Sequence, residues 1–273
     1  MKTIYHLLIF AVLPFCAGAK SLFDPSILAQ SICENTERYD YAARFRRIHS
    51  LDQTISLNDA EYYLNFLERP FEKGSLTKGQ LAALKNDLAD KLLAQRTLPR
   101  GFTERFLRMM DQEALGVVWR DYVVQKLPDL YERTVEKEGA LVLSKLWETT
   151  DSQMHTFSGT ALLGLNRVRY VHPESIDSAV FAEKARAIVT GSAFPEPNKA
   201  TALQLLAEES QQEALRLARE ILCSEASVML HISAMGILGI SGEPADKNVL
   251  SHYAKSSEFR LRRAAQSALK RFD

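Results

Sequence analysis

The chain has 273 residues, 46% of them hydrophobic, and its 34 basic and 34 acidic residues leave a net charge of zero. This length is enough for one large domain or for two. The even charge balance argues against a nucleic-acid partner, because such partners normally require a basic surface. After the first residues, no hydrophobic run reaches the roughly 20 residues of a membrane-spanning helix. We therefore expect no stable membrane insertion of the mature protein.

The first 19 residues have the pattern of a cleavable secretion signal. Lys2 supplies a short positive region, an apolar segment runs from Ile4 to Cys16, and Ala17-Gly18-Ala19 supplies the small residues of a cleavage site. We predict cleavage after Ala19 and a periplasmic or secreted protein. Lipidation at Cys16 stays open as an alternative, although the residue before it is larger than lipoprotein signals normally have.

Residues 20–98 predict helices without a clear repeat. Asp24-Pro25 is typical of a helix start. Asn58–Glu61 and Thr77–Gln80 have the pattern of capping boxes, in which an acid or amide comes three residues after the cap. The second box begins a helix with leucines along one face: Leu81, Leu84, Leu88 and Leu92. We expect this part to be a helical N-terminal region or a cap on the helices of the second part.

That second part begins at residue 99, where Pro99-Arg-Gly101 interrupts the helical pattern. Thr103 is the predicted cap of the next helix. Apolar residues then recur at helical spacing from Leu115 to Leu127. We expect this helix to end at Leu127, because the residue before a proline disfavours helical conformation and Pro128 is next in the chain.

The C-terminal half of the chain predicts helices in pairs. Residues with turn propensity separate these pairs, among them His172-Pro173 and Gly242-Glu-Pro244. The expected pairs are Leu130–Trp147 with His155–Leu165, Ile176–Val189 with Asn198–Glu208, Gln211–Cys223 with Val228–Ile240, and Asp246–Lys255 with Phe259–Phe272.

The last two pairs repeat each other at an interval of 31 residues. The apolar residues of one copy correspond to those of the next: Leu230, Ala234 and Leu238 to Leu261, Ala265 and Leu269. Small residues at such positions let a neighbouring helix approach closely, while leucines fill the space beside it. A two-helix unit of this length is typical of an α-solenoid. No alternating run indicates a strand, so the predicted fold class is all-α.

The segment Leu261-Arg-Arg-Ala-Ala-Gln-Ser-Ala-Leu269 resembles the second helix of a HEAT repeat, whose usual pattern is an aliphatic residue, Arg, small residues and Ala-Leu. The preceding copy departs from it with His231 and Ile232 in place of two arginines. The resemblance implies HEAT-like stacked helical hairpins over residues 99–273, with a divergent helical N-terminal region. HEAT-like proteins are mostly binding scaffolds and in a minority enzymes, so the fold carries little functional information.

Two cysteines remain after cleavage, Cys33 and Cys223. An oxidising compartment would permit a disulfide between them. In a solenoid, however, residues near opposite ends lie farther apart than the roughly 7 Å between Cα atoms that a disulfide spans. Both neighbour apolar helix residues, and we favour two buried free thiols.

Motifs with a defined catalytic mechanism are missing from the sequence. Gly159–Gly164 has the glycine spacing of a phosphate loop but lacks the Lys and Ser/Thr of that motif, so small residues at a helix contact are the simpler interpretation. Five histidines remain after cleavage and none pair at i, i+4. His231 is interpreted as a hydrogen-bonded histidine of the core. We therefore predict no catalytic residue, no cofactor and no metal site.

Two groups of residues are candidates for binding a partner. The first is Trp119, Arg120, Asp121 and Tyr122, although the two aromatic residues also continue the apolar stripe and the two charged residues could face solvent or pair with a neighbouring helix. The second comprises Arg260 and Arg263 of the last helix. These arginines could contact an anionic partner, or form the polar outer face that the final helix of a stack requires.

The leading functional prediction is a non-enzymatic scaffold that binds a protein partner, as a peptide or a domain, through the concave face of the stack. The alternative is an enzyme or enzyme accessory with a site in that face, which requires a pocket with convergent titratable groups. A third possibility, nucleic-acid binding, would need a continuous positive stripe, and the composition argues against it.

Overall fold

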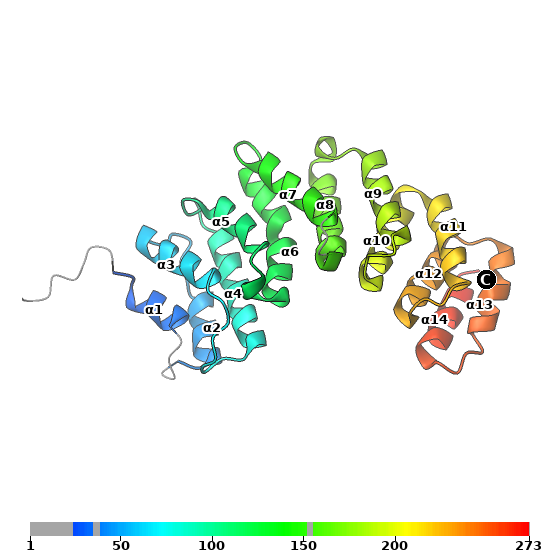
Figure 1. The fold of residues 1–273 in the computed structure, drawn as a ribbon, viewed down its shortest axis with the longest axis horizontal. Coiled ribbons are helices and arrows are strands. Elements are labelled where there is room, and N and C mark those ends of the chain that lie inside the picture. Colours follow the sequence, from blue (N-terminus) through cyan, green and yellow to red (C-terminus); the bar gives the residue numbers. More distant parts are fainter. Residues whose placement is uncertain (1–23, 35–38, 152–154, 273) are drawn as a thin grey trace, which may run out of the picture.

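The computed structural model describes residues 24–34, 39–151 and 155–272, and the regular structure within these ranges is helical (Figure 1). They contain fourteen α-helices and four short 3-10 helices, and no strand occurs within them. The predicted all-α fold class is therefore confirmed. Among these helices, none is both long and apolar enough to cross a membrane.

The helices form an arched array of stacked hairpins with two layers (Figure 1). Each inner helix packs against the next inner helix along the array. In chain order the inner helices are α2 (Tyr41–His49), α4 (Lys78–Leu93), α6 (Val117–Thr134), α8 (Ser158–Val171), α10 (Glu196–Glu209), α12 (Val228–Ser241) and α14 (Phe259–Leu269). The outer helices are α3 (Leu57–Leu67), α5 (Phe102–Met109), α7 (Gly139–Asp151), α9 (Ser178–Thr190), α11 (Gln211–Leu222) and α13 (Lys247–Tyr253). At the N-terminal end, α1 (Ile27–Cys33) packs against α2 and α3.

The repeat length changes along the array. From α4 to α10, successive inner helices begin 38 to 41 residues apart, whereas α12 and α14 begin 32 and 31 residues after the preceding inner helix. Helices α4 and α6 pack directly against each other, so the inner layer continues across the predicted boundary at residue 98. The N-terminal region is thus built from the same kind of hairpin as the rest.

Small residues set the contact between the last two inner helices, as the sequence predicts. Ala265 and Ala268 are the buried residues of α14. A Cβ on Gly239 of α12 would lie 2.8 Å from the Cα of Ala268. The two helices are therefore as close as their backbones allow, and a larger residue at either position would force them apart.

Cross-links between polar side chains join neighbouring repeats in both layers. In the inner layer, Lys126 pairs with Asp90, and Arg169 pairs with Glu209. In the outer layer, Lys145 pairs with Asp111 at 2.8 Å. Because each pair joins residues from adjacent hairpins, the pairs fix the stacking of one hairpin on the next.

The prediction that a helix ends before Pro128 is wrong. Helix α6 continues through this proline to Thr134. Pro128 is buried and faces Gly164 of α8, where an added Cβ would lie 3.3 Å from the proline Cγ. Tertiary packing thus outweighs the lost backbone hydrogen bond. The expected helix Leu130–Trp147 is accordingly divided between the end of α6 and α7.

Several local predictions need similar correction. The capping box of Thr77 and Gln80 is present, but Ser56 rather than Asn58 caps α3. Helix α5 begins after Gly101, whose φ of 69° lies in the left-handed region. Both cysteines are free, and Cys33 is buried as expected, whereas Cys223 is exposed at the end of α11.

Candidate functional site

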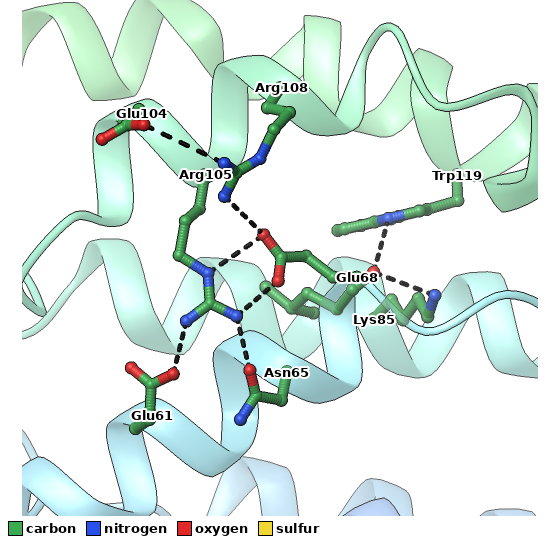
Figure 2. Close-up of polar contacts among 9 residues, drawn as sticks. Glu61, Asn65, Glu68, Lys85, Glu104, Arg105, Arg108 and Trp119 are labelled. Atoms are coloured by element: carbon green, nitrogen blue, oxygen red, sulfur yellow. Dashed lines mark hydrogen bonds and ion pairs between the residues drawn. The ribbon is translucent and has the colours of Figure 1, made fainter.

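The candidate site lies at the C-terminal end of α3. The last carbonyl groups of a helix have no partner within the helix and need other donors. Trp119 Nε1 donates to the carbonyl oxygen of Leu67 at 3.1 Å, and Lys85 Nζ donates to the same oxygen at 3.0 Å (Figure 2). Lys85 Nζ also donates to the carbonyl oxygen of Arg69. One residue from α4 and one from α6 therefore hold the end of α3.

Lys85 is unusual because it is a buried lysine, only 2% exposed. In the described part of the chain it forms no ion pair with a carboxylate. Burial, and to a smaller extent the nearby charge of Arg69, lowers the pKa of its amine to about 7. The rings of Trp119 and Phe66 lie 5.7 Å and 5.9 Å from Nζ and favour the charged form, but burial outweighs them. The amine is thus able to lose its proton near neutral pH.

Lys85 and Trp119 both line a cavity of about 350 Å³ at the N-terminal ends of α4 and α6, which we call the α4–α6 pocket. Its walls are mainly apolar, with Phe71, Leu81, Leu115, Val117, Val118 and Trp119. Two charged residues contribute to its lining, Lys78 and Lys85, and no acidic residue does. Val117 and Val118 are about half exposed, so apolar surface extends to the mouth of the pocket. The pocket therefore combines an apolar interior with positive charge.

A network of charged side chains lies next to this site and joins α3 to α5 (Figure 2). Arg105 donates to Glu61 at 2.8 Å, to Asn65 at 2.7 Å and to both oxygens of Glu68, which Arg108 also contacts. Burial alone would raise the pKa of Glu68, but the hydrogen bonds and charge of Arg105 outweigh it and hold the pKa below its usual range. These groups satisfy one another, so we assign the network a structural role.

The first predicted group of partner-binding residues does not form one site. Trp119 faces the α4–α6 pocket, whereas Arg120 is buried, donates from Nε to the carbonyl oxygen of Met110 at 2.6 Å and lies 5.2 Å from the ring of Phe157. Asp121 accepts from Thr160 of α8 at 2.7 Å. Of the four residues, Trp119 alone contributes to this pocket.

Tyr122, the fourth member of that group, is partly buried against the core. The second group lies at the opposite end of the array, on α14 (Figure 1). Arg260 and Arg263 are exposed, and Arg260 pairs with Glu258 at 3.0 Å. No structural feature of the described residues connects these arginines with the α4–α6 pocket.

Lys85 was missed by the sequence analysis, although a signal was present. It lies four residues after Leu81 and therefore belongs to the apolar face of α4. A lysine at such a position has to be paired, to reach the surface or to give up its charge. His231, by contrast, behaves as predicted: its Nε2 lies 3.1 Å from the carbonyl oxygen of Ile221, and the ring is buried.

Other cavities of the described chain have less suitable linings. A groove of about 500 Å³ between α10 and α12 is largely apolar and contains Glu208. A cavity of about 560 Å³ beside the C-terminal ends of α4 and α6 mixes basic and acidic residues. Within the described ranges, no three His, Cys, Asp or Glu side chains are placed to hold a metal ion. The α4–α6 pocket differs from both of these cavities in combining apolar walls with a charged lining that consists of lysines alone.

A comparison with known proteins finds similarity to a solved structure. No protein-family model and no curated protein match the chain. A structure of human deoxyhypusine hydroxylase in complex with glycerol is similar over 90% of this chain and 94% of that one, with 14% identity and a TM-score of 0.41. The predicted non-enzymatic scaffold is corrected to this extent: the protein found is a hydroxylase, so the comparison gives the scaffold no support. At this identity the likeness concerns the fold alone, so the reaction of that protein is not carried over.

Proposed function

We propose that the protein binds a small organic anion with an apolar body in the α4–α6 pocket. The observation that carries this proposal is an apolar cavity of about 350 Å³ whose charged lining residues are both lysines. Pockets for small ligands are typically apolar, with a few polar groups that fix the orientation of the ligand. A site of this kind is what an enzyme or an enzyme accessory requires, which was the alternative prediction.

The two lysines have different tasks in this proposal. Lys78 is exposed, and its Nζ lies 5.6 Å from the ring of Phe71 near the entrance. It supplies a charge that attracts an anionic group while the flexible stem adapts to the ligand. Lys85 belongs to the pocket lining and contributes a buried amine that hydrogen bonds hold in place. An anionic ligand would therefore enter with its apolar body toward Trp119 and keep its charged end near Lys78.

Decanoate, a ten-carbon carboxylate, tests the proposal by isothermal titration calorimetry. The matched probe is decyltrimethylammonium, which has the same chain length and the opposite charge. We expect saturable binding of decanoate and at least tenfold weaker binding of the cation. Equal affinities for the two probes would contradict the proposal, because the positive lining would then have no role.

A variant that fills the pocket provides the control on location. Gly79 lines the pocket, and a Cβ added there meets no atom within 4 Å, so Gly79→Leu should occupy the cavity without disturbing α4. Gly236 of α12 is equally open and lies outside the α4–α6 pocket, in the groove between α10 and α12, so Gly236→Leu is the matched control and a loss of binding in this variant alone would place decanoate in that groove. We expect Gly79→Leu to weaken decanoate binding at least tenfold and Gly236→Leu to leave it unchanged. The same loss in both variants would place the binding elsewhere.

We also propose that the protein acts outside the cytoplasm. This part rests on the signal pattern of residues 1–19, which lie outside the described residues. Intact-mass analysis of the protein from a secreting host tests it. The expected mature N-terminus is Lys20, and a chain that keeps Met1 in the secreted fraction would contradict the proposal.

A further inference from the structure

We infer that Lys85 captures the carbonyl carbon of a small aldehyde or ketone as an imine inside the α4–α6 pocket. This inference rests on the proposed function, because the carbonyl compound has to enter the same pocket. It names a ligand class: molecules with an apolar body, an anionic group at one end and a carbonyl group at the other.

The hydrogen bonds of Lys85 orient its amine for this reaction. Nζ donates to the carbonyl oxygens of Leu67 and Arg69. A neutral amine has two N–H groups and one lone pair, so these two acceptors use both N–H groups. The lone pair is then directed away from the end of α3. Lys85 lines the pocket and is only 2% exposed, so the pocket is the route by which we expect a reagent to reach this amine.

The surroundings of Lys85 also differ from those of other lysines. Lys126, Lys145 and Lys184 each pair with an aspartate. Lys85 pairs with no carboxylate among the described residues, and its burial, with a smaller effect of the charge of Arg69, lowers its pKa to about 7. A larger share of this amine than of an ordinary lysine is therefore neutral and nucleophilic at neutral pH.

The step is balanced without an added oxidant or reductant. The lone pair of Nζ attacks the carbonyl carbon, the C–N bond forms, and the carbonyl oxygen takes up a proton to give a carbinolamine. Loss of this hydroxyl group as water, with a proton from nitrogen, leaves the C=N bond. Lys78 lies seven residues earlier on α4, about 10 Å along the helix axis. It is placed to hold the anionic end while the carbonyl end reaches Lys85.

Reductive trapping of 4-formylbenzoate tests the inference. The protein is incubated with this aldehyde and cyanoborohydride at pH 7.5, and the labelled lysines are identified by peptide mass spectrometry. We expect label on Lys85 at least tenfold above any other lysine, with protection by excess decanoate. The rate at Lys85 should level off above about pH 7, whereas exposed lysines should continue to gain reactivity toward their ordinary pKa of about 10.4.

Variants separate this inference from the proposed function. Lys85→Met should remove the label, and Gly79→Leu should slow labelling of Lys85 at least fivefold. Should Lys85→Met fail to fold, the pH profile and decanoate protection of the unmodified protein still decide. Saturable decanoate binding with label spread evenly over surface lysines would overturn the imine and leave the proposed function standing. Absence of both would overturn both, and unchanged labelling in Gly79→Leu would overturn the route through the pocket.

Discussion

Two glycines of α12 give a sharp test of how closely the inner helices pack. A Cβ on Gly239 would lie 2.8 Å from the Cα and 2.9 Å from the Cβ of Ala268, so α14 itself would have to move. A Cβ on Gly236, three residues earlier, would meet no atom within 4 Å. Neither glycine has a positive φ. The same substitution, glycine to alanine, therefore isolates the helix contact.

The expected effects have opposite signs. Alanine is favoured over glycine in a helix interior by about 1 kcal/mol. Gly236→Ala should gain most of this, about 0.5–1 kcal/mol in the free energy of unfolding. In Gly239→Ala the same gain is offset by overpacking, which costs roughly 1–3 kcal/mol where side chains can adjust and more where backbone atoms are involved. We expect a net loss of about 1–2 kcal/mol, and a difference between the variants of about 1.5–3 kcal/mol.

Urea denaturation monitored by circular dichroism at 222 nm measures both variants. Since α14 ends the array, part of the loss in Gly239→Ala could appear as local detachment of this helix. Amide hydrogen exchange in Phe259–Leu269 detects such detachment and should be faster in this variant alone. Equal stability of the two variants, with equal exchange in α14, would refute the close contact.

Three further predictions concern single residues. The pKa of Lys85 falls from about 10.4 in the unfolded chain to about 7 in the folded one, so the unfolded state binds more protons between these pH values. The free energy of unfolding, relative to that of Lys85→Met, should therefore rise from pH 7 to pH 10. Parallel curves of unfolding free energy against pH for the two proteins would contradict this. Arg105→Ala should cost about 1–3 kcal/mol, since it leaves Glu68 without its main donors. Arg216→Ala, at an exposed pair, should lower Tm far less; equal losses would argue against the network. Cys223 should react at once with a thiol reagent, and Cys33 on unfolding only, because burial raises its pKa; two thiols reacting together would contradict the burial.

The C-terminal helices could be predicted from the sequence because the same types of residue form the helix contacts in successive repeats. The alanines of Phe259–Leu269 and the small residues of Val228–Ser241 occur at helical spacing, and this spacing reflects close approach of the two helices. Helices α9 and α10 also agree closely with the expected segments. In the N-terminal half the hairpins stack in the same way, but their longer repeats share no residue pattern. In that half, the periodicity of the apolar residues predicted the helices but did not predict that they stack in one array.

The residues that the sequence did not reveal depend on partners from other helices. Pro128 is accommodated because Gly164, in α8, leaves room for its ring. Lys85 is held by carbonyl groups at the end of α3, and a carbonyl group is present at every position of any sequence. The pocket beside Lys85 likewise forms between the ends of two helices. Such features depend on how hairpins are placed, which local patterns do not specify.

Ligand binding beside Trp119 is the central claim, and the indole N–H signals of the protein test it most directly. The chain has two tryptophans, and Trp147 of α7 does not line the α4–α6 pocket. In a ¹⁵N-labelled sample, with the signals assigned through Trp147→Phe, decanoate is added stepwise. We predict a saturable shift of the Trp119 signal and a constant Trp147 signal. A Trp119 signal that stays in place at saturating decanoate, or moves no more than that of Trp147, would contradict the claim.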